Sequence, residues 1–112
     1  MLDPIASRLE SYLDLLAQRQ KLVTTNIANA DTPGYRTRDI DFQTEFQSFS
    51  RGASPTILNP HGLTVKNDGN DVSLDRESRL LAENAMRFNL AASLLKGQMQ
   101  MVRKAIEEGK NG

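Results

Sequence analysis

Few residues of the 112-residue sequence have a type and spacing that could do chemistry. Asp39 and Asp41 stand two apart, but in a run of alternating charge, where we expect solvated carboxylates. His61 is the single histidine and has no partner at metal-ligand spacing, so we interpret it as a turn residue. The Asn- and Asp-rich loop around Gly69 suggests a calcium loop. If Gly69 held the sixth position, however, Lys66 would occupy the third, which needs an oxygen ligand.

Composition and motifs exclude several classes of protein. Cysteine is absent, which excludes disulfides, cysteine–zinc sites and thiol catalysis. Lys plus Arg and Asp plus Glu both number 14, so the chain has no basic footprint for a nucleic acid. The sequence has no phosphate-binding glycine loop, nucleophile elbow or paired-histidine motif. We therefore expect no cofactor, no metal, no nucleic acid partner and no enzymatic activity.

The N-terminal segment predicts a long helix from about Pro4 to Asn29, with Asp3 as its cap, because no glycine or further proline interrupts it. Alternate steps of four and three residues give a nearly unbroken apolar seam, which is typical of a helix packed lengthwise on another helix. Its members are Leu2, Ala6, Leu9, Leu13, Leu16, Gln20, Val23, Ile27 and Ala30.

The C-terminal segment predicts a second long helix, from near Asp75 to about Glu108, capped by Ser73 or Asp75 and followed by Gly109. The same stepping gives an unbroken apolar seam of Leu81, Ala85, Phe88, Ala92, Leu95, Met99, Val102 and Ile106. Other apolar residues lie off this seam, namely Leu80, Leu90, Leu94 and Met101. A two-helix hairpin would leave them in water, so we expect a further partner.

Together these patterns predict a mainly α fold, in which the two long helices pair as an antiparallel coiled-coil hairpin around a short irregular or β middle segment. The segments are 1–31, 32–72 and 73–112, together one domain. In the middle, Pro33-Gly34 fits a type II turn. Phe42, Phe46 and Phe49 predict a short amphipathic helix docked on the long ones. The runs 56–58 and 63–65 could form a small hairpin.

One stretch is more specific than these patterns. The residues Ala28, Asn29, Thr32, Pro33, Gly34 and Tyr35, preceded by Asn26, match a turn after a long N-terminal helix. This turn resembles the N-terminal signature of the bacterial flagellar axial proteins, which include the rod, hook and hook-associated families. The runs 38–42, 67–77 and 82–84 are similar to the narrower pattern of proximal rod subunits. The resemblance covers both ends of the chain, whereas the middle is shorter than is usual for the family.

The resemblance implies a structural subunit of the proximal rod of the flagellar basal body. Such subunits assemble helically through their terminal helices around a channel in the cell envelope, and help to transmit torque from motor to hook. They leave the cytoplasm unfolded through type III export, which fits the lack of a cleavable signal here. The implied partners are other copies, other rod subunits, the export gate and the base ring. No apolar run is long enough for membrane insertion.

Two details and one alternative remain open at this stage. Asn26 and Asn29 could hold the turn against a neighbouring subunit, or cap the helix locally. Phe42-x-x-x-Phe46 resembles the short signal that export gates read, although the two rings could simply pack on the long helices. A cytoplasmic coiled-coil adaptor or export chaperone would use the same seams. The Thr32–Tyr35 turn favours the rod subunit, because an adaptor has no need of it.

Overall fold

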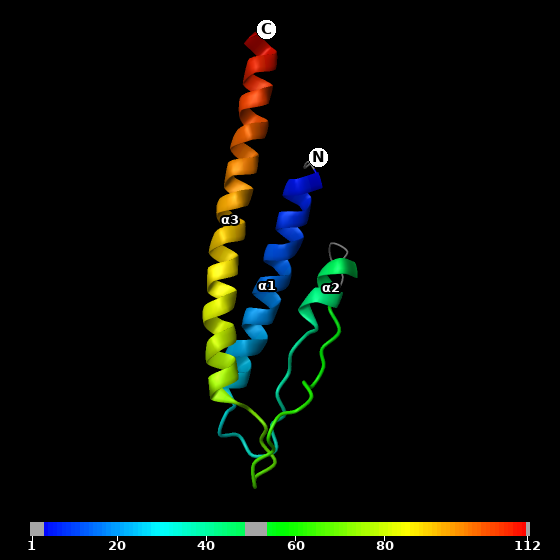
Figure 1. The fold of residues 1–112 in the computed structure, drawn as a ribbon, viewed down its shortest axis with the longest axis vertical. Coiled ribbons are helices and arrows are strands. Elements are labelled where there is room, and N and C mark those ends of the chain that lie inside the picture. Colours follow the sequence, from blue (N-terminus) through cyan, green and yellow to red (C-terminus); the bar gives the residue numbers. More distant parts are fainter. Residues whose placement is uncertain (1–3, 49–53, 112) are drawn as a thin grey trace.

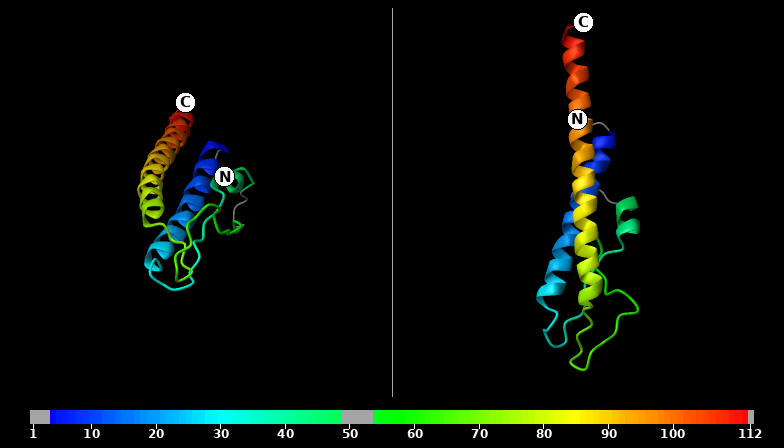
Figure 2. Two further views of the ribbon diagram at one scale, coloured as in Figure 1. Left: turned by 60° about the horizontal axis from the view of Figure 1, so that its bottom comes forward. Right: turned by 60° about the vertical axis from the view of Figure 1, so that its left-hand side comes forward.

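A computed structural model describes residues 4–48 and 54–111 of the chain. The described residues form α1 (Pro4–Ala28), α2 (Phe42–Ser48) and α3 (Leu74–Asn111). α1 and α3 run antiparallel and pack along their length, and α2 lies on the other side of α1 (Figures 1 and 2). The expected mainly α hairpin is confirmed. Nowhere in these ranges is a helix both long and apolar enough to cross a membrane.

The ends of the helices follow from local chemistry. Ser73 caps α3, because its Oγ accepts a hydrogen bond from the Arg76 N–H at 3.2 Å. The prediction that α3 ends before Gly109 was wrong, since the helix runs on to Asn111. Gly109 does not adopt a positive φ, and a Cβ there would meet nothing within 4 Å. The expected cap Asp3 lies outside the described residues.

The apolar core is small and lies mostly on α1. Ala6, Leu15, Leu16 and Val23 are buried on α1, and Ala91 is buried on α3. Ala30, Ile40 and Val72 close the core at the turn end. The buried residues of α3 are mainly polar, at a spacing of seven: Glu77, Asn84 and then Ala91. The face of α3 that packs against α1 therefore lies beside the predicted apolar seam. It includes only part of that seam.

The middle segment connects the helices with little regular structure. The predicted hairpin of 56–58 with 63–65 was wrong, because Leu58 forms an isolated antiparallel bridge with Asp39 instead. The Leu58 and Asp39 backbones bond each other in both directions, at 2.8 and 2.9 Å. The predicted short helix is confirmed as α2, which packs on α1. Asp41 caps it through Thr44, whose Oγ1 lies 3.0 Å from the carboxylate. Phe49, the third ring of the predicted helix, lies outside the described residues.

Candidate assembly surfaces and the turn that supports them

Asn26 ties the end of α1 to the following chain and to α3. Its Nδ2 donates to the Arg38 carbonyl at 2.9 Å and to Glu77 Oε1 at 2.5 Å. Its Oδ1 accepts from the Tyr35 hydroxyl at 2.8 Å and from the Arg38 N–H at 3.1 Å. The side chain is fully buried. All of its hydrogen-bonding capacity is therefore used inside the chain.

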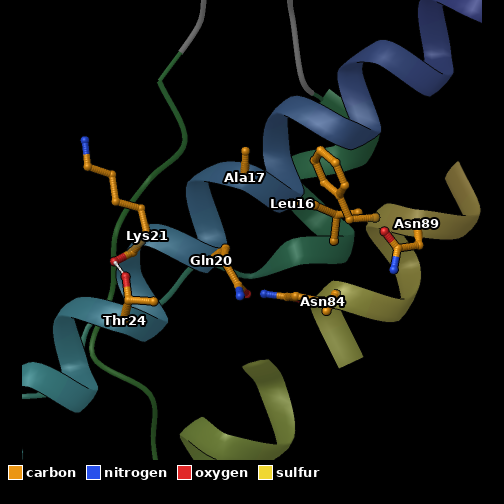
Figure 3. A pocket seen from close by; sticks show the side chains of 9 residues that line it. Leu16, Ala17, Gln20, Lys21, Thr24, Asn84 and Asn89 are labelled. Carbon is orange, nitrogen blue, oxygen red and sulfur yellow. Dashed lines mark hydrogen bonds between the residues drawn. The ribbon is translucent and has the colours of Figure 1, made fainter. Parts of the chain in front are cut away.

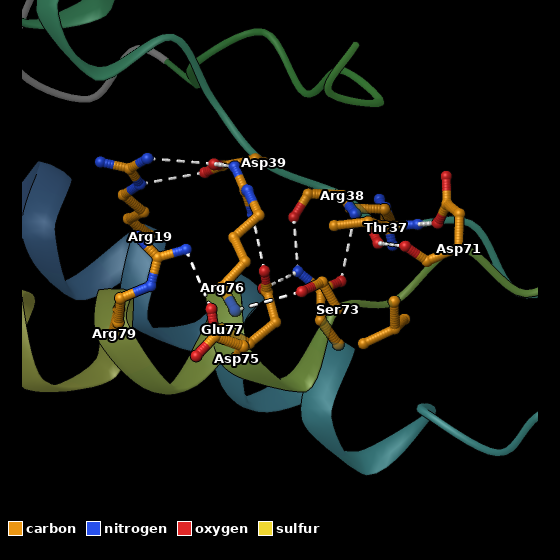
Figure 4. A network of polar contacts seen from close by, with 12 residues as sticks. Arg19, Thr37, Arg38, Asp39, Asp71, Ser73, Asp75, Arg76, Glu77 and Arg79 are labelled. Carbon is orange, nitrogen blue, oxygen red and sulfur yellow. Dashed lines mark hydrogen bonds and ion pairs between the residues drawn. The ribbon is translucent and has the colours of Figure 1, made fainter. Parts of the chain in front are cut away.

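A chain of buried and half-buried charges continues from this amide (Figure 4). Arg76 bonds Glu77 Oε2 at 2.6 Å and Asp39 Oδ2 at 2.5 Å. Arg19 of α1 donates two hydrogen bonds of 3.0 Å to the Asp39 carboxylate, in the bidentate geometry typical of arginine and carboxylate. Burial alone would raise the pKa of Asp39, but the bonds from Arg19, Arg76 and the Ile40 N–H lower it below its usual value. The network links α1, the middle segment and α3.

The turn after α1 is built on two glycines. Pro33-Gly34 forms the predicted type II turn, since Gly34 has φ +75° and the Tyr35 N–H donates to the Thr32 carbonyl at 3.2 Å. The Gly34 N–H donates to the Asp68 carbonyl at 2.8 Å, in a second turn. In that turn Gly69 has φ +85°, and a Cβ on it would lie 3.4 Å from the Gly34 Cα. The two turns therefore pack backbone to backbone.

Asn70 and Asp71 hold these turns from the α3 side. The Asn70 amide donates to the carbonyls of Asn29 and Thr32, at 2.9 and 2.8 Å. Asp71 accepts from the Thr37 N–H at 2.5 Å, and from Arg36 and Asn59 at 3.0 and 2.9 Å. Burial alone would raise the pKa of Asp71, but these hydrogen bonds outweigh it and lower the pKa to about 2. This carboxylate is a structural anchor.

The structure favours local roles for the two motif asparagines. Asn29 donates to the Thr25 carbonyl at 2.9 Å and accepts from the Thr32 hydroxyl at 3.0 Å. Both amides therefore bond within the chain, and these bonds account for the turn without a neighbouring subunit. Of the other motif residues, Ala28, Thr32, Pro33 and Gly34 are exposed and Tyr35 is half-buried. Their outer face is open to a partner.

The two rings of the possible export signal pack on α1. Tyr12 makes edge contacts with Phe42 and Phe46, at centroid distances of 5.4 and 5.2 Å. The Arg8 guanidinium lies 4.3 Å from the centre of the Phe46 ring. This packing accounts for both rings in the folded chain. A chain exported unfolded would present them without these contacts, so the packing does not test the signal.

The two predicted seams differ in how far they are buried in the hairpin. On α1, Leu16 and Val23 are buried and Leu9, Leu13 and Ile27 are half-buried, so this seam serves the hairpin itself. On α3 only Leu81, Ala92 and Leu95 are half-buried. The remaining members are exposed: Ala85, Phe88, Met99, Val102 and Ile106. Most of the α3 seam therefore stays available to another chain.

Two grooves run along the hairpin, one on each side of the α1–α3 contact. The first has a volume of about 430 Å³ and is lined by Leu16, Gln20, Asn84 and Phe88, among others. In it Gln20 and Asn84 point toward each other, yet Gln20 Oε1 and Asn84 Nδ2 have no hydrogen-bond partner (Figure 3). The second, of about 520 Å³, is more apolar.

The buried polar network is what residue patterns alone missed. Asp39 was expected to be solvated but is buried, whereas Asp41 is exposed as expected. Hydrophobic periodicity could not predict that Arg19, Arg76 and Glu77 join this network, because it assigns charged residues to the solvent-exposed face of a helix. The available signal was the resemblance, because runs 38–42 and 67–77 contain most of the network. Among the described residues no cluster of His, Asp or Glu could hold a metal ion.

Comparisons with known proteins agree with this geometry. A family model described as flagella basal body rod protein matches residues 10–36, the stretch from α1 through the Thr32–Tyr35 turn. The flagellar basal body rod protein FlgB of Escherichia coli (strain K12) is 32% identical over 137 aligned positions, covering 97% of this chain and 99% of the relative. FlgB of Salmonella typhimurium (strain LT2) is 30% identical with the same coverages. FlgB of Borreliella burgdorferi is 28% identical over 74% of this chain.

The alignment also bears on length. Its 137 positions exceed the 112 residues of this chain by 25, so the Escherichia coli relative carries residues that have no counterpart here.

The fold and the near-complete coverage define the class: a structural subunit of the flagellar basal-body rod, not an enzyme. Within that class, the chain belongs to the family of the flagellar basal body rod protein FlgB.

Proposed function

We propose that this chain is a proximal rod subunit that assembles helically through its terminal helices and helps to transmit torque from motor to hook. The observation that carries the proposal is the exposed part of the α3 seam. Met99, Val102 and Ile106 continue a stripe that is half-buried lower down at Leu81 and Leu95. An apolar helical stripe left in water is the usual mark of a surface that a partner covers.

The turn network supports the mechanical part of the proposal. A subunit that carries torque must resist splaying of its two helices. Arg19, Asp39 and Arg76 join the helices through part-buried, charge-assisted bonds at the turn end, where an apolar core alone would be small. Such a fixed end would pass a load from α1 to α3 with little deformation.

We also propose that the chain leaves the cytoplasm through the type III export apparatus without a cleaved signal, and acts in the periplasmic rod. Its proposed partners are other rod subunits, itself, the export gate and the components of the base ring. No observation favours the adaptor or chaperone alternative.

The assembly surface can be tested without disturbing the hairpin. Val102→Asp with Ile106→Asp places two charges on the exposed seam, and we expect unchanged helicity of the isolated chain but loss of rods and motility. The control Ser93→Asp with Gln100→Asp adds the same charge at exposed positions off the seam, and should leave motility intact. Normal motility of the seam variant would contradict assembly through this stripe.

The export signal has its own test. Phe42→Ala with Phe46→Ala should lower the amount of chain exported from the cytoplasm. Tyr12→Ala removes the same ring contacts from the other side and leaves the two phenylalanines in place. We expect this control to be exported normally. Equal export of both variants would remove the signal and leave packing as the only role of the two rings.

A further inference from the structure

α3 packs on α1 through a face that is poor in apolar residues. Its inner column, as we call it, consists of residues no more than 3% exposed at a spacing of seven: Glu77, Asn84 and Ala91. The apolar seam runs beside it, because Phe88 and Ala85 follow Asn84 by about 40° and 100° around the helix axis. Both are exposed. Turning α3 about its axis by roughly 70° would put the seam in place of the inner column. Hydrophobic burial alone would favour that rotation.

Asn84 does not explain why α3 keeps the observed rotation. Its Nδ2 is buried without a hydrogen-bond partner among the described residues, near an equally unpartnered Gln20 Oε1 of α1 (Figure 3). A buried polar atom that lacks its hydrogen bond destabilises the fold. Asn84 therefore gains little from its place between the helices, and another residue of α3 must hold it there.

Glu77, in the first turn of α3, is the member of the inner column that is firmly bonded. Its side chain is fully buried. One carboxylate oxygen accepts a hydrogen bond from Asn26 of α1 at 2.5 Å, and the other accepts from Arg76 at 2.6 Å. Rotating α3 toward its seam would carry Glu77 away from α1 and break the bond to Asn26. Charge-assisted bonds of this kind are about twice as strong as neutral ones, so they can outweigh the apolar gain.

We infer that Glu77, through Asn26, fixes the rotation of α3 about its own axis and thereby the direction in which the apolar seam faces. α3 is one unbroken helix from Leu74 to Asn111, so a rotation fixed in its first turn is carried along its length. The inference rests on the proposed assembly, whose surface is this seam, and names the residue that orients it. Glu77 is a positioning residue, because it acts through the orientation of α3 and touches no partner itself.

A buried carboxylate suits this role better than an apolar side chain would. An apolar residue at position 77 could pack on α1 over a range of rotations, since apolar contacts have little directionality. The carboxylate is satisfied only where Asn26 and Arg76 both reach it. In coiled coils, a single polar residue within an apolar seam likewise specifies how the helices align, at a cost in stability.

Cysteine reactivity in the isolated full chain tests the rotation, because the natural sequence contains no cysteine. Ala85→Cys places a thiol on the exposed seam, and Ala91→Cys places one in the inner column. With Glu77 present, a maleimide should modify the thiol at 85 severalfold faster than the thiol at 91. Adding Glu77→Ala should slow the reaction at 85 and speed it at 91, each severalfold. Glu77→Gln keeps an oxygen acceptor for Asn26, and as the matched control should leave both rates nearly unchanged.

The opposite signs at the two positions separate a rotation from simple loss of structure, which would speed both reactions. Asn26→Asp is a second variant, since it removes the donor to Glu77 but keeps oxygen acceptors for Tyr35 and Arg38. We expect the same opposite changes from it. Equal rates at 85 and 91 with Glu77 present, or no opposite change in either variant, would overturn the inference. The isolated chain reports the rotation whether or not it builds a rod, so this failure would leave the proposed function standing. Complete basal bodies in cells lacking the chain would instead refute that function.

Discussion

Replacing Asn26 by alanine is the sharpest test of how the turn is held. The change removes four hydrogen bonds from one buried amide. Tyr35 is half-buried and can recruit water in exchange. Glu77 cannot do so, since its side chain is fully buried and Arg76 would remain its only side-chain partner among the described residues.

The magnitude follows from these partners. A buried group left without its hydrogen bond costs about 1–3 kcal/mol, at the upper end for a charged one such as Glu77. The N–H and carbonyl of Arg38 also lose their partners. We therefore expect Asn26→Ala to lower the free energy of unfolding by about 3–5 kcal/mol. Asn29→Ala loses only two local bonds, with an expected cost of about 1 kcal/mol.

Urea unfolding of the full chain, followed by far-ultraviolet circular dichroism, would measure both changes. Asn67→Ala serves as the control, because this asparagine is exposed in a turn and should change stability little. If Asn26→Ala and Asn29→Ala had equal, small effects, the view of Asn26 as the link between the turn and α3 would be refuted.

Four further predictions use the same measurement. Because Asp71 has its pKa lowered from 3.8 to about 2, its stabilisation is complete above pH 3.8 and is lost as the pH falls toward 2; Asp71→Asn should flatten the pH dependence of stability in that window. Gly34→Ala should cost about 1–2 kcal/mol, since the turn needs φ +75°. Gly97→Ala should stabilise by about 0.5–1 kcal/mol, because Gly97 is helical and a Cβ would meet nothing within 4 Å. Tyr35→Phe, which loses only the bond to Asn26, should cost about 1 kcal/mol; the opposite sign in any of these would contradict its stated cause.

Most of the fold could be predicted from hydrophobic periodicity and from local residue preferences. The absence of helix breakers between Pro4 and Asn29 placed α1 to within a residue. The second helix was predicted to begin near Asp75, with Ser73 or Asp75 as its cap, and α3 begins one residue earlier, at Leu74. Pro33-Gly34 defined its turn type because proline fixes φ and glycine accepts a positive one. These features are local, so the sequence pattern contains them. The end of α3 was missed because a glycine is compatible both with a helix end and with an exposed helical position.

The non-local features were not predictable in this way. Asp39 pairs with residues 20 positions before it and 37 after it, and no local pattern separates it from Asp41. The pairing of Leu58 with Asp39 depends on how the middle segment lies across the hairpin. The α3 face that meets α1 holds Glu77 and Asn84, which a hydrophobic pattern assigns to solvent. The burial of Glu77 depends on Asn26, which reaches its carboxylate from α1.

The central claim is that this chain builds the rod, and electron microscopy of basal bodies from cells lacking it tests that claim most directly. The account predicts membrane rings without rod or hook, and recovery of both when the natural chain is restored. Complete basal bodies with normal hooks in the absence of the chain would contradict it.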